Sequence, residues 1–171
     1  MSVYVEKIRV PVRLSQPNLD PRDGCFLLFP RQGDENRPET LVELLNSERL
    51  VVPFILSGDS TVLLLSRKNI DWVMVSPSVE MGLVLPPGLE WNRTQRAELR
   101  FMDEARVEAM LGWSTERTAQ RLSDHLNCCD RFVASLASFG TLIWNKHRIR
   151  EVRILEAKSA TNPPSSGARA A

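Results

Sequence analysis

The sequence predicts a mainly β protein with short helices (α+β), made of two tandem small five-stranded β-barrel-like units. Each unit has one helix inserted between its strands 2 and 3. Three observations support this fold class: an internal repeat, short alternating apolar segments typical of half-buried strands, and one short helical segment per repeat. With 171 residues in total, each unit is close to the lower limit of independent stability. We therefore expect the two units to share an interface.

The repeat is found in three pairs of segments. They are 41–46 (LVELLN) with 122–127 (LSDHLN), 62–73 with 141–152, and 9–14 with 96–101. The domains expected from it are a first barrel-like repeat at 1–76, a linker packing on the barrels at 77–95, a second repeat at 96–156, and a disordered tail at 157–171. Internal repetition constrains architecture strongly and chemistry hardly at all.

The first strand is expected at 9–14, because Val10, Val12 and Leu14 alternate with polar residues. Pro11 indicates that this strand lies at an edge or a bulge, since proline cannot donate a ladder hydrogen bond. The remaining strands of the first unit are expected at 25–29, 50–56, 61–65 and 70–75.

The helix of the first unit is expected to begin at Pro38, which suits the first helical position. Glu39 favours the positive end of the helix dipole, and Asn46 suits a left-handed C-terminal cap. Arg49 is placed to bond the free carbonyls of the last helical turn. The same local geometry in both units would explain these residues without any reactive role.

The second unit is expected to repeat this order. Its strands are predicted at 96–101, 105–111, 131–136, 141–144 and 149–155, with the helix at 119–126. Asn127 and Arg131 take the places of Asn46 and Arg49.

The composition argues against several classes of protein. Lys plus Arg total 22 and Asp plus Glu total 21, so no net field attracts nucleic acid or an anionic membrane. No apolar stretch reaches the roughly 20 residues of a membrane span, and the first residues lack a signal-peptide core. Three cysteines, an odd number, do not make a secreted disulfide framework. We therefore expect a soluble cytoplasmic protein with no membrane contact.

The strand count and compactness of each unit resemble small β-barrels of the Sm-like kind. The position of the helix departs from that pattern, because the Sm-type helix precedes the first strand. The segment 121–127 (RLSDHLN) also resembles a motif in bacterial proteins of unassigned function. That resemblance covers one segment per unit and implies no activity.

A catalytic, cofactor or metal site is not expected. His125 lies near Asp124, Cys128 and Cys129, but adjacent cysteines rarely both point at one ion, and the first unit does not repeat these residues. Neither His125 nor His147 belongs to a recognisable nucleophile motif. Phosphate-cradling and dinucleotide-binding glycine motifs are not found. Ordinary packing and helix-end roles explain these residues better than a metal or an enzyme site.

Two pairs of arginines are candidates for ligand binding. Arg9 with Arg13, and Arg96 with Arg100, would each project from one strand face roughly 13 Å apart. This spacing resembles the first half of the PilZ signature, whose Arg-x-x-x-Arg segment grips cyclic di-GMP on a β-barrel. The second half of that signature, with its Ser and Gly, is not found in either unit. Solvated strand faces are the favoured interpretation.

The most basic stretch, 145–153, contains Lys146, Arg148 and Arg150 beside Trp144. Such a segment could follow phosphates while an aromatic ring stacks on a base. A charged strand edge also prevents unwanted sheet pairing, which is the commoner reason for these residues. Trp72 is a further candidate, either as an outward contact for a partner or as packing between the units.

The leading hypothesis is a non-enzymatic protein-interaction module: an adaptor, scaffold or regulatory subunit that binds another protein or itself. The alternative is a nucleic-acid- or nucleotide-binding β-barrel that uses the outward arginines. The candidate interaction surface comprises Trp72, Trp144, Lys146, Arg148, Arg150, Arg9, Arg13, Arg96 and Arg100.

Overall fold

The computed structural model describes residues 7–30, 37–114, 121–128 and 130–155; the tail expected at 157–171 lies outside them. The first half contains β1 (Ile8–Ser15), β2 (Arg22–Leu28), β3 (Val51–Leu56), β4 (Val62–Ser66) and β5 (Trp72–Val75). The second half contains β6 (Arg93–Phe101), β7 (Arg106–Trp113), β8 (Phe132–Ala137), β9 (Gly140–Asn145) and β10 (Ile149–Ile154). The short helices are α1 (Leu41–Asn46), α2 (Met81–Val84) and α3 (Leu122–Cys128), and the 3-10 turns are η1 (Arg67–Asn69) and η3 (Lys146–Arg148).

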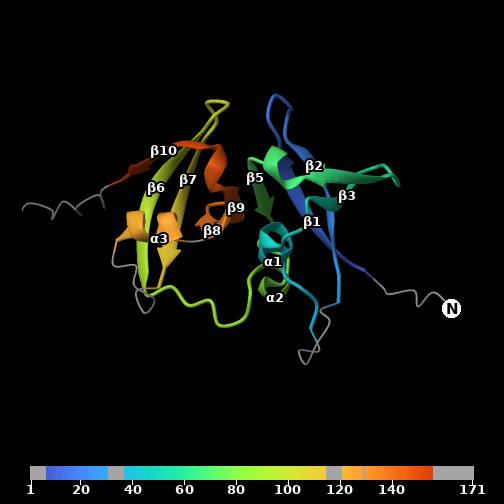
Figure 1. Ribbon diagram of the computed structural model, residues 1–171, viewed down its shortest axis with the longest axis horizontal. Helices are drawn as coiled ribbons and strands as arrows, with labels where there is room; N and C mark the ends of the chain where they lie inside the picture. The colour runs from blue at the N-terminus through green and yellow to red at the C-terminus, as the bar shows by residue number, and fades with distance from the viewer. Residues whose placement is uncertain (1–6, 31–36, 115–120, 129, 156–171) are drawn as a thin grey trace, which may run out of the picture.

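All ten strands belong to one antiparallel sheet, with the order β10-β6-β7-β8-β9-β5-β1-β2-β3-β4 (Figure 1). The order β5-β1-β2-β3-β4 of the first half recurs as β10-β6-β7-β8-β9 in the second. In each half a helix lies between the second and third strands, and a 3-10 turn joins the fourth strand to the fifth. The prediction of a mainly β protein with short helices is confirmed.

Closure into two separate barrels is not confirmed, because the sheet is open. β5 pairs with β9 of the other half, and β4 and β10 lie at the two ends of the strand order. Even so, each half is strongly bent. Its fourth and fifth strands lie four strand spacings apart in the order, about 19 Å in a flat sheet. A three-residue 3-10 turn, which rises about 2 Å per residue, joins them.

The strand pairing changes one part of the predicted repeat. Leu14 of β1 pairs with Val73, and Leu99 of β6 pairs with Val152. Since Val73 and Val152 are equivalent, Leu14 is the counterpart of Leu99, two residues away from the predicted alignment. Arg9 and Arg13 are therefore not the counterparts of Arg96 and Arg100, and that part of the prediction is wrong. A shift of two residues keeps every apolar side chain on the same face, so the alternation in the sequence cannot detect it.

The core consists of two hydrophobic clusters that cross the boundary between the halves. The first cluster belongs mainly to β1–β5 and α1, but it also contains Phe132, Ala134 and Ile143 from β8 and β9. Val84 of α2, in the segment between the halves, is buried in this cluster as well. The second cluster belongs to β6–β9, and Trp72 of β5 packs against it. Each half thus depends on side chains from the other.

Helix α1 begins at a capping box rather than at Pro38. The Thr40 side chain accepts a hydrogen bond from the Glu43 backbone, and the Glu43 carboxylate accepts one from the Thr40 backbone. Pro38 instead forms an isolated bridge with Pro30. The helix ends at Ser47, which has an extended conformation. The predicted left-handed cap at Asn46 is wrong, because Asn46 remains helical.

None of the helices in the described part of the chain is long and apolar enough to cross a membrane.

Candidate interaction surface

The two halves meet where β5 pairs with β9, near the middle of the molecule in Figure 1. Trp72 lies opposite Trp144, and Val73 lies opposite Ile143. Trp144 is 1% exposed and its Nε1 donates a hydrogen bond of 2.8 Å to Ser135 Oγ, so its ring is not available to stack on a base. Trp72 is half-buried. Of the two roles considered for Trp72, packing between the halves is the one observed.

Asn46 joins α1 to the first residue of β8. Its side-chain amide donates to the Phe132 carbonyl oxygen at 2.9 Å, and its side-chain oxygen accepts from the Phe132 backbone N–H at 2.8 Å. The amide side chain thus pairs with both the N–H and the carbonyl oxygen of one residue, as a neighbouring strand would. This bidentate contact explains the asparagine that sequence reasoning assigned to a helix cap.

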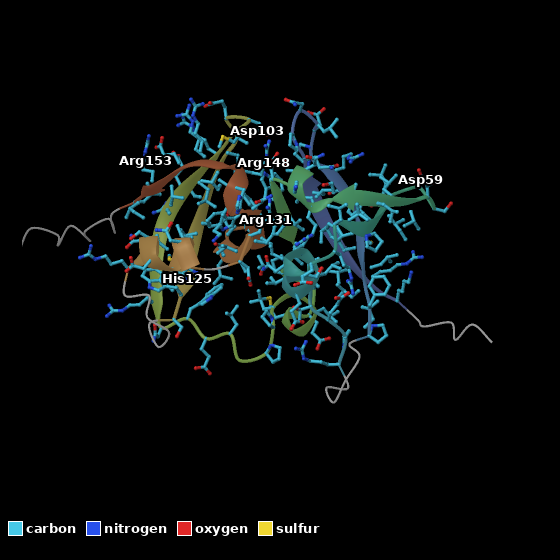
Figure 2. The ribbon with its side chains drawn as sticks, viewed as in Figure 1. Asp59, Asp103, His125, Arg131, Arg148 and Arg153 are labelled. Carbon is cyan, nitrogen blue, oxygen red and sulfur yellow. The ribbon has the colours of Figure 1, made fainter. Side chains whose placement is uncertain are left out.

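Asp71 and Arg148 form an ion pair at the same joint, where Arg148 Nε lies 2.8 Å from Asp71 Oδ1. Asp71 is only 1% exposed; burial raises the pKa of its carboxyl group above 3.8, and the hydrogen bond from Arg148 opposes this shift. Arg148 lies between the two halves in Figure 2. Because removing one partner of a buried pair is costly, Arg148 is a structural residue of the joint rather than a free phosphate ligand.

A basic residue at each 3-10 turn bonds the end of the preceding helix. Lys146 Nζ donates to the Leu126 carbonyl oxygen at 2.7 Å, and Arg67 donates in the same way to the Leu45 carbonyl oxygen at 2.9 Å. Sequence reasoning assigned this role to Arg49. Arg49 instead pairs with Glu39 at 2.8 Å, and its guanidinium lies over the ring of Phe29.

Most of the predicted outward arginines have carboxylate partners. Arg100 and Arg150 both pair with Glu104, Arg96 lies 2.6 Å from Glu108, and Arg13 lies 4.0 Å from Asp23. Arg9 is exposed on β1. Ion pairing lowers the ability of the paired arginines to attract phosphate.

Sequence reasoning predicted a strand at 61–65 but did not identify this strand, β4, as an exposed edge of the sheet. Val62 and Leu64 are exposed on this strand, Leu64 to 68%. Val51, the first residue of the neighbouring strand β3, and Leu50 just before it are exposed as well. Figure 2 shows Asp59 at the tip of the β3–β4 hairpin, which extends away from the body of the molecule. The run VLLLS resembles a core strand in sequence, and only the strand order shows that one edge is unpaired.

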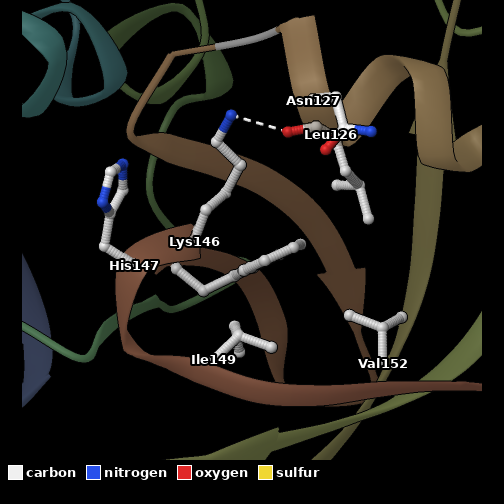
Figure 3. A pocket seen from close by; sticks show the side chains of 7 residues that line it. Leu126, Asn127, Lys146, His147, Ile149 and Val152 are labelled. Carbon is white, nitrogen blue, oxygen red and sulfur yellow. Dashed lines mark hydrogen bonds between the residues drawn. The ribbon is translucent and has the colours of Figure 1, made fainter.

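The other end of the sheet has a hollow beside β10. It measures about 380 Å³ and is lined by Leu126, Asn127, Trp144, Lys146, His147, Ile149 and Val152 (Figure 3). Apolar side chains form its floor, and the hydrogen bond from Lys146 to Leu126 closes one side. The strand itself carries the exposed residues Arg150, Arg153 and Ile154.

Both histidines of the chain lie in the described residues. Burial lowers the pKa of His125 and of His147, which favours their neutral forms. No group of three or more His, Cys, Asp or Glu side chains in the described part of the chain is placed to hold a metal ion. The Cys128 and Cys129 side chains lie outside the described residues.

Comparison with known proteins gives no relative: no family model, no curated protein and no solved structure matches this chain.

Proposed function

We propose that this chain is a non-enzymatic protein-interaction module, an adaptor, scaffold or regulatory subunit built from a duplicated, strongly bent, barrel-like β unit. The observation that carries the proposal is the unpaired, apolar edge strand β4, with Val62 and Leu64 exposed. We also place the protein in the cytoplasm, because its three cysteines do not suit a secreted disulfide framework.

Strand addition is the binding mode that suits this edge. An added strand takes hydrogen bonds from the backbone of β4, while exposed side chains such as Leu64 give specificity. Natural edge strands are usually protected from pairing by charged residues, bulges or proline. β4 (VLLLS) has none of these within the strand, whereas β10 (IREVRI) has three charged residues. An unprotected edge of this kind supports a binding surface for a polypeptide.

The alternative, a nucleic-acid- or nucleotide-binding barrel, has weaker support. Arg148 is committed to Asp71, and Arg96, Arg100 and Arg150 are paired with glutamates. The aromatic ring expected beside them, Trp144, is buried. A nucleic-acid groove needs both free cations and accessible rings.

The test is capture of partners from a lysate of the source cell with three forms of the tagged protein: wild type, Leu64→Lys and Leu19→Lys. Leu64 lies on β4, and Leu19, also an exposed leucine, lies in the turn between β1 and β2. Each capture is repeated after nuclease treatment. Both substitutions place the same charge on the surface, so they differ only in the surface that they alter.

We expect a stoichiometric protein partner that survives nuclease, is kept by Leu19→Lys and is lost with Leu64→Lys. Recovery of nucleic acid, with proteins released by nuclease, would instead favour the arginine-based alternative. Equal capture by the two lysine variants would show that β4 is not the binding surface.

A further inference from the structure

We infer that the β4 edge binds a second copy of this chain, head to tail, so that β10 of one molecule pairs with β4 of the next. This inference rests on the proposed function, because it names the partner of the same edge. Its basis is the joint between the halves, which already shows how a strand equivalent to β10 pairs with a strand equivalent to β4.

The internal joint supplies the register. The 3-10 turns η1 and η3 occupy the same place in the two halves, which makes β10 the counterpart of β5 and β4 the counterpart of β9. In the joint, Val73 of β5 lies opposite Ile143 of β9. The corresponding residues are Val152 of β10 and Leu64 of β4. A second joint with the same register would therefore place Val152 opposite Leu64.

The side chains at the joint have exposed counterparts. Phe132, Ala134 and Ile143 enter the hydrophobic cluster of the first half and complete it. The pairing within each hairpin identifies their counterparts in the first half. Asn145 and Ser66 are equivalent, because each directly precedes a 3-10 turn, and they pair with Phe132 and Val51 respectively. The counterparts of the three inserted side chains are Val51, Pro53 and Leu64 in the β3–β4 hairpin. Val51 and Leu64 are exposed, and Pro53 is half-buried.

The hollow beside β10 is the receiving site for these side chains. Four residues that line the hollow have counterparts in the first hydrophobic cluster, which side chains of β8 and β9 complete. The four residues are Leu126, Trp144, Ile149 and Val152. Their counterparts are Leu45, Leu65, Ile70 and Val73. In the first half Phe132, Ala134 and Ile143 fill this space. In the second half the space is open (Figure 3). An exposed leucine and a hollow with an apolar floor are thus present at opposite ends of the same sheet.

The asparagine contact is repeated too. Asn127 aligns with Asn46 and lies in the last turn of α3, one residue before the helix ends, and Val51 occupies the position of Phe132 at the start of the strand. Asn46 bonds the backbone N–H and carbonyl oxygen of Phe132. Asn127 is exposed and also lines the hollow, so it is placed to bond Val51 of the next molecule in the same way.

The contact between molecules differs from the internal joint on the other face of the sheet, the one that packs against the second hydrophobic cluster in the joint. There Trp72 and Met74 of β5, which pack against the second cluster, correspond to Glu151 and Arg153 of β10. Less apolar surface is buried, so we expect association weaker than the internal joint and dependent on protein concentration. A head-to-tail interface joins different surfaces and produces a ring or an open chain of molecules.

The test uses two proteins, each with one new cysteine: Leu64→Cys and Val152→Cys. Side chains directly opposite in an antiparallel pair have Cβ atoms about 4.5–5.5 Å apart, close enough for a disulfide after small adjustments. We expect a mixed disulfide between positions 64 and 152 when the two proteins are combined under mild oxidation. Peptide mapping separates this bond from any formed by the native cysteines. Leu19→Cys mixed with Val152→Cys is the control.

A yield of the 64–152 bond no higher than that of the control would overturn the inference. Preferential bonding of Leu64→Cys to itself would also overturn it, because that outcome shows a two-fold β4–β4 contact. Sedimentation of the wild-type chain gives a second measurement: association must increase with concentration, and a monomer at every concentration would contradict the inference. If such a monomer still captured another protein through β4, the proposed function would stand and only the head-to-tail partner would fail.

Discussion

Replacing Asn46 with alanine removes the bidentate contact between α1 and β8. The substitution deletes two hydrogen bonds, of 2.9 and 2.8 Å, to the backbone of Phe132. The Phe132 residue is 2% exposed, so water does not readily replace the lost partner. The perturbation therefore tests whether the joint between the halves is built as described.

The expected cost follows from the groups left without partners. Each buried polar group that loses its hydrogen bond costs about 1–3 kcal/mol. Alanine recovers up to about 0.7 kcal/mol through its higher helix propensity. With two groups left without partners, we therefore expect Asn46→Ala to lower the free energy of unfolding by about 1.3–6 kcal/mol.

Urea unfolding followed by tryptophan fluorescence measures this change, and Asn127→Ala is the matched control. Asn127 is at the equivalent position of α3 and is exposed in the single chain. In dilute solution its substitution should change the free energy of unfolding by no more than about 0.5 kcal/mol. Equal destabilisation by the two variants would refute the special role of Asn46.

Three further outcomes are expected. Gly140→Ala should destabilise the protein much more than Gly58→Ala. Both glycines have positive φ, but a Cβ at Gly140 would clash with the Val75 carbonyl oxygen, whereas no atom lies near a Cβ at Gly58. The midpoints of urea unfolding give the ranking. Burial raises the pKa of the Asp71 carboxyl group above 3.8, so its contribution to stability is present at lower pH and is lost as the pH rises through the folded-state pKa. The free energy of unfolding, measured at several pH values, should therefore fall for wild type relative to Asp71→Asn as the pH rises through that pKa. The double variant Arg96→Gln, Arg150→Gln should leave the affinity for the partner and its salt dependence unchanged, because both guanidiniums are already paired with carboxylates. A binding titration at several salt concentrations tests this, and a weaker dependence of affinity on salt in the variant would reveal phosphate contacts.

The sequence was sufficient to predict the strands and the existence of one helix in each half, but not the ends of α1 or the short helix α2. Alternating apolar residues such as Val10, Val12 and Leu14 identify strands because one face of each is buried. The repeat also placed a helix after the second strand of both halves, as observed. These features depend on neighbouring residues, so a linear pattern contains them.

Features that depend on distant pairing could not be predicted. In the repeat, Leu14 corresponds to Leu99 and not to Phe101, two residues away. This correspondence depends on which residues of β5 and β10 lie opposite β1 and β6. The open sheet depends on β5 choosing β9 as its neighbour. Asn46 was assigned to a cap because its partner, Phe132, lies 86 residues further along the chain. In each case the deciding contact is invisible to a local pattern.

The candidate surface was predicted least well, for a related reason. Exposed arginines such as Arg150 are prominent in a sequence, but their neutralising partners come from distant segments, here Glu104 in the turn between β6 and β7. Conversely, an apolar run such as β4 suggests a core strand until the strand order shows its unpaired edge. Exposure of Leu64 is therefore a property of the assembled sheet, not of its own segment.

The central claim is that β4 is the edge through which this protein binds a polypeptide. Amide hydrogen exchange, compared between the dilute free chain and the purified complex, tests it most directly, because a newly paired strand protects the outward backbone N–H groups of its neighbour. We expect exchange in Val62–Ser66 to slow on binding, while the turn around Leu19 is unchanged. Unchanged exchange in β4, with protection confined to other surfaces, would contradict the account.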